Sequence, residues 1–212
     1  MNPSAPIPGP TWLGRVSYAV AHRAQRERRE AILRGDAPEA IWLLEHDSVV
    51  TTGRRAAEVD VDALARRGVP VVATERGGLA TWHGPGQLVG YLLIDVASRQ
   101  GTIHGLVCAL EAGLIAWLAS RGWSARRESP HRGVFVAGNK VAAIGLHVRR
   151  GVTMHGFALN LTCDLSAYDA IVPCGLRDFG VAAVGDEAPG AAAASVGDFV
   201  RAALVDALGP RR

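Results

Sequence analysis

A long predicted β-hairpin constrains the fold of this chain more than any other feature. Two runs rich in apolar and β-branched residues, 141–148 and 152–161, flank the tight turn Arg149-Arg150-Gly151. Runs of this kind, separated by a short turn that contains glycine, are typical of antiparallel strands. The chain must therefore contain an antiparallel sheet, and other elements must cover the apolar face of these two strands.

Residue periodicity and turn residues predict further helices and strands on both sides of the hairpin. Helices are expected over 17–33, 59–67 and 102–121, with a last amphipathic helix from Ser195 to about residue 208. Strands are expected over 40–44, 48–52, 70–73, 88–96 and 133–136, the last ending in a hairpin turn at 137–139. We expect a loose, Pro-rich tail over 1–10, one helical turn over 164–170 and a loop over 185–194. Together these elements predict one α+β domain over 1–212, with a mixed, mainly antiparallel sheet flanked by helices.

Charge and hydropathy argue against several classes of protein. The net charge of +3 is too small to indicate a nucleic-acid-binding protein. The longest apolar runs have about ten residues, fewer than a membrane-spanning helix requires. The prolines among the first ten residues do not fit a signal peptide. We therefore expect a cytoplasmic protein with no membrane and no nucleic-acid partner.

The three cysteines, Cys108, Cys163 and Cys174, are widely spaced. No CxxC pair is present, so their spacing does not predict a zinc site, and we expect neither a metal ion nor a cofactor. In a reducing cytoplasm the three side chains would remain free thiols.

A glycine-rich segment, residues 76–87, predicts a binding pocket. It contains four glycines and one proline, which indicate a backbone of special turns and not a packed element. Arg76, Thr81, His83 and Gln87 would supply polar groups, while the glycines let the backbone approach a ligand closely. The segment matches neither a GxGxxG motif nor a Walker loop, so it gives little support to nucleotide binding.

Cys174 is the candidate nucleophile. It lies between Pro173 and Gly175, a pattern that ends a strand in a sharp turn and lifts the thiol clear of the sheet. A free thiol has a pKa near 8.5 and needs an activating group. His155 would serve as in a cysteine protease, and Lys140 would serve as an ammonium or amine beside the sulfur. An inert buried cysteine and a solvated hairpin lysine are the alternatives, and spacing alone does not decide between them.

Three segments carry a resemblance to a known family: RGGLATWHGPGQLVGYLLID from Arg76, GNKVAAIGLHVRRGVTMHGFALNL from Gly138 and IVPCGL from Ile171. Together, over about residues 12–181, they resemble the octanoyltransferases of lipoate biosynthesis, the lipoyl(octanoyl) transferases. EHDSVVTTGRR from Glu45 resembles them more weakly. Leu79 and Asp47-Ser48 depart from the family pattern, at the expected edge of the pocket.

The resemblance implies the fold of biotin and lipoate protein ligases and a specific chemistry. The octanoyl group would pass from octanoyl-acyl carrier protein, through a thioester on Cys174 activated by Lys140, to a lysine of an acceptor. The acceptors would be the lipoyl domains of 2-oxoacid dehydrogenase complexes and the glycine cleavage H protein. The implied acyl-binding residues are Arg76, Gly77, Gly78, Leu79, Ala80, Thr81, Trp82, His83, Ala143, Ile144, Gly145, Gly156, Phe157 and Ala158.

Two other functions stay open on the sequence. An ATP-dependent lipoate or biotin protein ligase of the same fold would adenylate its substrate and would give Cys174 no chemical role. A non-catalytic acyl-binding protein would bind the ligand without turnover.

Overall fold

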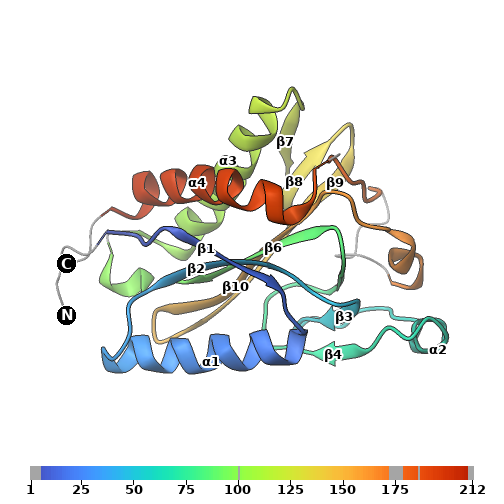
Figure 1. The fold of residues 1–212 in the computed structure, drawn as a ribbon, viewed down its shortest axis with the longest axis horizontal. Helices are drawn as coiled ribbons and strands as arrows, with labels where there is room; N and C mark the ends of the chain where they lie inside the picture. Colours follow the sequence, from blue (N-terminus) through green and yellow to red (C-terminus); the bar gives the residue numbers. More distant parts are fainter. Residues whose placement is uncertain (1–5, 100, 172–178, 186, 210–212) are drawn as a thin grey trace.

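The chain forms a seven-stranded sheet covered by helices on both faces (Figure 1). A computed structural model describes residues 6–99, 101–171, 179–185 and 187–209. The strand order in the sheet is β1 (Pro10–Arg15), β2 (Ala40–Glu45), β6 (Gln87–Leu93), β10 (Val152–Asn160), β9 (Asn139–Arg149), β8 (His131–Val136) and β7 (Ala125–Glu128). β1 and β2 are parallel, and the other neighbours are antiparallel. The predicted α+β class with a mainly antiparallel sheet is confirmed.

A smaller sheet and the helices complete the fold. The small sheet has the order β4 (Val71–Ala73), β3 (Val49–Thr52) and β5 (Ala80–His83). The helices are α1 (Tyr18–Arg34), α2 (Val61–Arg66), α3 (Ile103–Ser120) and α4 (Pro189–Leu208), with 3₁₀ turns η1 (Val96–Ser98) and η2 (Ser166–Ala170). In Figure 1, α3 and α4 lie above the central strands and α1 lies below them.

The predicted hairpin is confirmed as β9 and β10. Its register runs from the pair Arg149 and Val152 at the turn to the pair Ala142 and Leu159. Arg150 and Gly151 both have positive φ, +52° and +86°. Two successive residues with positive φ match the twist of the flanking strands, which is why a two-residue turn closes this hairpin.

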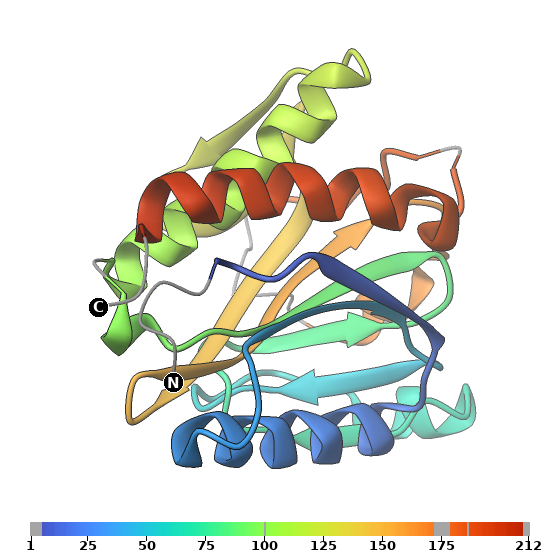
Figure 2. The same ribbon diagram turned by 60° about the vertical axis from the view of Figure 1, so that its left-hand side comes forward.

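Helices α3 and α4 pack closely together on one face of the sheet (Figure 2). A Cβ atom on Gly113 of α3 would lie 2.7 Å from the Cα of Val200 in α4, so glycine permits this close approach. By length and composition alone, α3 is apolar enough to cross a membrane. In this fold its apolar side chains, among them Leu110 and Leu114, belong to the main hydrophobic core.

Three predictions at the ends of the chain are wrong. The predicted tail 1–10 is contradicted by Ile7, which is buried in the core, and by Pro10, which begins β1. The predicted loop 185–194 is wrong from Pro189 onward, because α4 begins there and not at Ser195. Proline suits the first turn of a helix, and the alanines that follow it favour helix. Ser195 lies inside α4, where its Oγ accepts a hydrogen bond from Trp117 Nε1 at 3.0 Å.

Candidate functional site

A cavity of about 610 Å³ opens between the main sheet, the segment 76–83 and α3. Its volume is in the range of small-ligand pockets. Its lining includes Lys140 and twelve of the fourteen predicted acyl-binding residues, namely Arg76, Gly77, Gly78, Leu79, Thr81, His83, Ala143, Ile144, Gly145, Gly156, Phe157 and Ala158. Side chains that the sequence did not single out, including Tyr18, Val89, Tyr91 and Leu146, complete much of the wall.

The two remaining predicted residues, Ala80 and Trp82, do not line the cavity. They belong to β5, a strand within the segment predicted to be unpacked turns, and that part of the prediction is wrong. Successive residues of a strand point to opposite faces, so Thr81 and His83 face the cavity while Ala80 and Trp82 enter a second apolar cluster, which also contains Val50 of β3. Trp82 Nε1 donates a hydrogen bond to Ser48 Oγ at 2.9 Å.

Glycines bring segment 76–78 against its neighbours. The Gly77 N–H donates to Leu146 O of β9 at 2.9 Å. A Cβ atom on Gly53 would lie 2.3 Å from Gly78 O, so only glycine allows the two backbones to approach this closely. The segment therefore forms a backbone wall of the cavity, as expected from its glycine content.

A buried chain of hydrogen bonds supports the polar end of the cavity. Asn160 Oδ1 accepts from Gln87 Nε2 at 2.9 Å, and Gln87 Oε1 lies 2.8 Å from His83 Nδ1. The Gln87 NH₂ group donates to Asn160, so Gln87 Oε1 accepts the hydrogen bond from His83. His83 therefore carries its proton on Nδ1. Thr51 Oγ1 lies 3.5 Å from His83 Nε2 and accepts from Arg76 Nε at 3.2 Å. Arg76 also donates to Thr51 O at 2.6 Å, so the network holds its guanidinium in place.

Burial keeps the histidine rings at the polar end of the cavity uncharged. It lowers the pKa of His83 to about 3, an effect that nearby His46 strengthens. Burial also lowers the pKa of His46, whose Nδ1 donates to Val16 O at 2.6 Å. Tyr91 Oη then donates to His46 Nε2, 2.6 Å away. The end of the cavity is thus polar, with neutral rings beside the Arg76 guanidinium.

Lys140 is the only lysine in the sequence, although the chain contains 23 Lys and Arg residues. It is the second residue of β9 and is only 3% exposed, which excludes the solvated hairpin lysine considered from sequence. Its Nζ donates to Arg132 O at 3.0 Å and lies 5.2 Å from the Phe135 ring centroid. Arginine is always charged in proteins, whereas a lysine amine can lose its proton. The sequence thus singles out Lys140 as a candidate functional residue without reference to any motif.

Cys174 lies outside the described residues, so its distance to Lys140 is not described. The described chain resumes at Phe179, whose ring packs edge-on against Phe135 with centroids 5.3 Å apart. The next residue, Gly180, accepts a hydrogen bond from the Lys140 N–H at 2.8 Å. Phe179 and Gly180, which follow Cys174 in the chain, therefore contact β8 and β9.

The other two thiols are placed away from the cavity. Cys163 is buried in the second apolar cluster, and burial raises the pKa of its thiol to about 11. Cys108 is half-buried in α3, with its Sγ 3.5 Å from His104 Nε2. Neither thiol lines the cavity.

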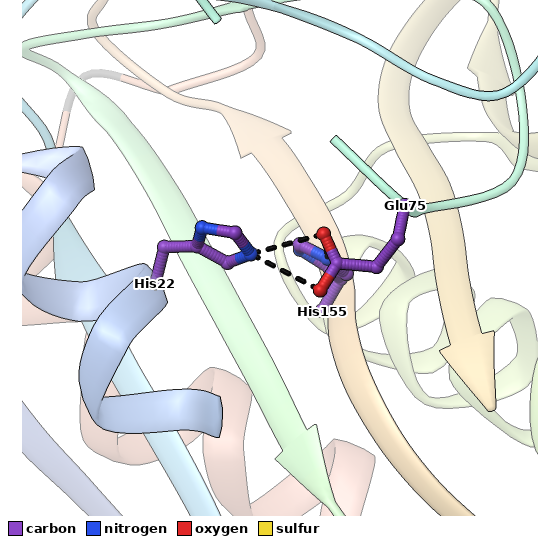
Figure 3. Close-up of side chains that lie close together, drawn as sticks. All are labelled: His22, Glu75 and His155. Carbon is purple, nitrogen blue, oxygen red and sulfur yellow. Dashed lines mark hydrogen bonds and ion pairs between the residues drawn. The ribbon is translucent and has the colours of Figure 1, made fainter. Parts of the chain in front are cut away.

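A further cluster of side chains was not found from the sequence. His22 of α1, Glu75 and His155 of β10 converge at one side of the cavity, and His155 lines it (Figure 3). No local spacing links residues so far apart in the chain, so no sequence motif could have shown the cluster.

Comparisons with known proteins agree on one family. Residues 17–207 match the family described as the lipoyl protein ligase A/B catalytic domain. An octanoyltransferase of Mycolicibacterium gilvum is 45% identical over 209 residues, covering 94% of this chain and 85% of that protein. An octanoyltransferase of Novosphingobium aromaticivorans is 44% identical over 180 residues, covering 81% and 80%.

Solved structures share the fold at low identity. The lipoate protein ligase of a bipartite archaeal system from Thermoplasma acidophilum superposes with a TM-score of 0.70 at 18% identity, over 95% of this chain and 84% of that one. A biotin protein ligase from Aquifex aeolicus superposes with a TM-score of 0.52 at 11% identity, over 93% and 69%. The fold expected from the resemblance is confirmed.

Proposed function

Because the chain belongs to the lipoyl protein ligase A/B catalytic-domain family, and within it to the octanoyltransferases, we propose that it transfers octanoyl groups through a thioester on Cys174. The donor is octanoyl-acyl carrier protein. The acceptor is a lysine of a lipoyl domain, as in 2-oxoacid dehydrogenase complexes and the glycine cleavage H protein. The reaction takes place in the cytoplasm.

The first step moves the acyl group onto the enzyme. The Cys174 sulfur attacks the carbonyl carbon of the donor thioester, and the bond between that carbon and the carrier's sulfur breaks. The carrier leaves as a thiol after it takes up a proton. Lys140 receives the proton of Cys174 and returns it to the leaving sulfur. One thioester replaces another, so the step needs no ATP.

The second step forms the product amide. The acceptor's lysine amine attacks the carbonyl carbon, and the bond between that carbon and the Cys174 sulfur breaks. The sulfur takes up the proton that the amine loses, and the free enzyme is restored. An amide is more stable than a thioester, so this step runs downhill.

One observation carries the proposal: the only lysine of an arginine-rich chain is buried at the edge of a cavity that suits an acyl chain. Ala143, Ile144 and Phe157 offer an apolar lining to that chain. At about 0.8 kcal/mol per buried CH₂, an octanoyl chain would contribute roughly 5 kcal/mol to binding. The other proposed acyl-binding residues at the cavity are Arg76, Gly77, Gly78, Leu79, Thr81, His83, Gly145, Gly156 and Ala158.

Intact-mass spectrometry after incubation with octanoyl-acyl carrier protein, without ATP, tests the proposal. The wild-type chain should gain one octanoyl group, and hydroxylamine should remove it, as expected for a thioester. Cys174→Ala should gain none, while Cys108→Ala should gain one as the matched control. Full adduct yield in Cys174→Ala would contradict the proposal, and a strict requirement for ATP would favour the ligase.

A further inference from the structure

Three metal-binding side chains meet beside the cavity (Figure 3). His22 Nε2 lies 3.1 Å and 3.0 Å from the two carboxylate oxygens of Glu75. His155 Nε2 lies 3.8 Å from Glu75 Oε2, beyond hydrogen-bond distance. One ligand atom from each residue lies within 4.8 Å of the other two. The three residues come from α1, the segment after β4 and β10, so folding alone assembles them.

The His155 ring has a buried nitrogen that forms no hydrogen bond with the part of the chain that the structure describes. Its side chain is 4% exposed, and its Nε2 makes no hydrogen bond within the described residues. Figure 3 shows the His155 ring behind the Glu75 carboxylate, and this ring stacks on that of His22 with centroids 5.6 Å apart. A buried polar atom left unpaired has lost its hydrogen bonds to water without replacing them, so such an atom needs an explanation. A ligand bound at this nitrogen supplies one.

We propose that His22, Glu75 and His155 bind a divalent cation of the zinc class. Two imidazole nitrogens and one carboxylate are a known zinc ligand set, and they leave a fourth position for water or another oxygen ligand. Tetrahedral bonds of about 2.0–2.2 Å place ligand atoms roughly 3.3–3.5 Å apart. The two histidine contacts with Glu75, at 3.0 Å and 3.8 Å, bracket that spacing. All three ligand atoms lie within 4.8 Å of one another, so side-chain rotations can bring them around one ion. Mg²⁺ and Ca²⁺ prefer oxygen ligands, so two imidazoles select against them.

The charges and contacts around the three residues suit this ion. The adjacent histidine rings, that of His155 most strongly, hold the pKa of the Glu75 carboxyl well below its usual range. The carboxyl group is therefore an anion at neutral pH. Burial lowers the pKa of His155, which keeps its ring neutral and able to coordinate. The His22 ring stacks on Tyr18 with centroids 5.6 Å apart, which orients its nitrogen. The Arg76 guanidinium is a nearby positive charge that opposes binding of a cation at these residues.

This inference does not depend on octanoyl transfer, and its test measures metal binding alone. The full chain carrying Cys174→Ala, which removes a competing thiol, is stripped with a chelator and titrated with Zn²⁺ by calorimetry. One Zn²⁺ ion per chain is expected. Titration with Co²⁺ should give the visible absorption of a tetrahedral ion, without the sulfur-to-metal band of a thiolate ligand.

Variants then locate the ion. His22→Phe keeps the ring stack but removes a ligand, and Glu75→Gln keeps the shape but removes the charge. Each should weaken Zn²⁺ binding at least tenfold, with unchanged circular dichroism. His104→Gln is the control, since His104 and Cys108 form a neighbouring pair of possible ligands elsewhere in the fold, and it should bind Zn²⁺ normally. No Zn²⁺ binding by the parent chain, full binding by folded His22→Phe and Glu75→Gln, or loss of binding in His104→Gln would each overturn the proposal.

Discussion

The main-chain N–H of Lys140 donates a hydrogen bond to the carbonyl oxygen of Gly180 at 2.8 Å. The pairing continues as a short parallel bridge, in which the Ala182 N–H donates to Lys140 O at 3.1 Å. Cys174 precedes Gly180 by six residues, and six extended residues span at most about 20 Å. Chain connectivity therefore permits the proposed meeting of Cys174 with the only lysine of the protein.

Replacing Lys140 with methionine should slow octanoyl transfer by about 10²–10⁴-fold, the usual contribution of a general acid–base group. Methionine fills a similar volume but cannot carry a proton. The measurement is the initial rate with saturating octanoyl-acyl carrier protein, alongside the urea unfolding midpoint. Lys140→Arg is the matched control, because an arginine side chain is always charged and can neither accept nor give up a proton at neutral pH. Near-normal activity of Lys140→Arg would argue against proton transfer by Lys140.

Enlarging Ala143 should shorten the acyl chain that the enzyme accepts. Ala143→Leu places three further carbons in the cavity, which excludes about three CH₂ groups at roughly 0.8 kcal/mol each. The rate for octanoyl should fall by about 50-fold relative to that for butanoyl. Competition assays with carrier proteins bearing different acyl chains measure this ratio. Leu146→Ala, on the same strand and also lining the cavity, should instead favour chains longer than octanoyl. Unchanged chain-length profiles in both variants would mean that the acyl chain binds elsewhere.

Stability should fall as the pH drops below about 6.5. His83 is buried, and burial lowers its pKa in the folded chain to about 3, from an ordinary value of 6.5. Between those values the unfolded chain binds a proton that the folded chain does not, so acid favours unfolding. Each such histidine should lower the free energy of unfolding by up to about 1.4 kcal/mol per pH unit in this range. His46 acts in the same direction, because burial lowers its pKa too.

Urea unfolding at pH 7.5, 6 and 5 measures this loss of stability in a pH range above that in which the carboxylates titrate. His83→Gln should reduce the dependence on pH across that range. A free energy of unfolding that stays constant from pH 7.5 to 5 would contradict the neutral, buried state of His83.

Breaking the buried ion pair between Arg99 and Glu39 should destabilise the fold by about 3–5 kcal/mol, because the remaining charge would be buried without its partner. Their side chains are 1% and 4% exposed, and Arg99 Nη1 also donates to Gly209 O at 3.0 Å. Denaturant unfolding of Arg99→Met measures the cost. Arg34→Met is the control, because its pair with Asp36 is 62% and 60% exposed, and it should change stability little. Equal effects of the two variants would refute the prediction.

Local sequence signals predicted the elements that depend on neighbouring residues. The β9–β10 turn needs two residues with positive φ, and Arg150-Gly151 satisfies that requirement within a few residues. Helix α3 begins one residue after Thr102, whose Oγ1 accepts from the Gly105 N–H at 2.9 Å. The prediction missed β1 and misplaced the start of α4, because pairing with β2 and packing on the sheet decide those elements.

The sequence by itself determined the α+β class, the central hairpin, the glycine-rich wall of the cavity and the candidate residues Lys140 and Cys174, because each rests on residue types at short spacing. Only the tertiary structure decided that Lys140 is buried, that Thr81 and His83 face the cavity while Ala80 and Trp82 do not, and that His22, Glu75 and His155 meet. Those facts depend on which strands and helices pack together, and contacts between residues far apart in the chain leave no pattern in a local stretch of sequence.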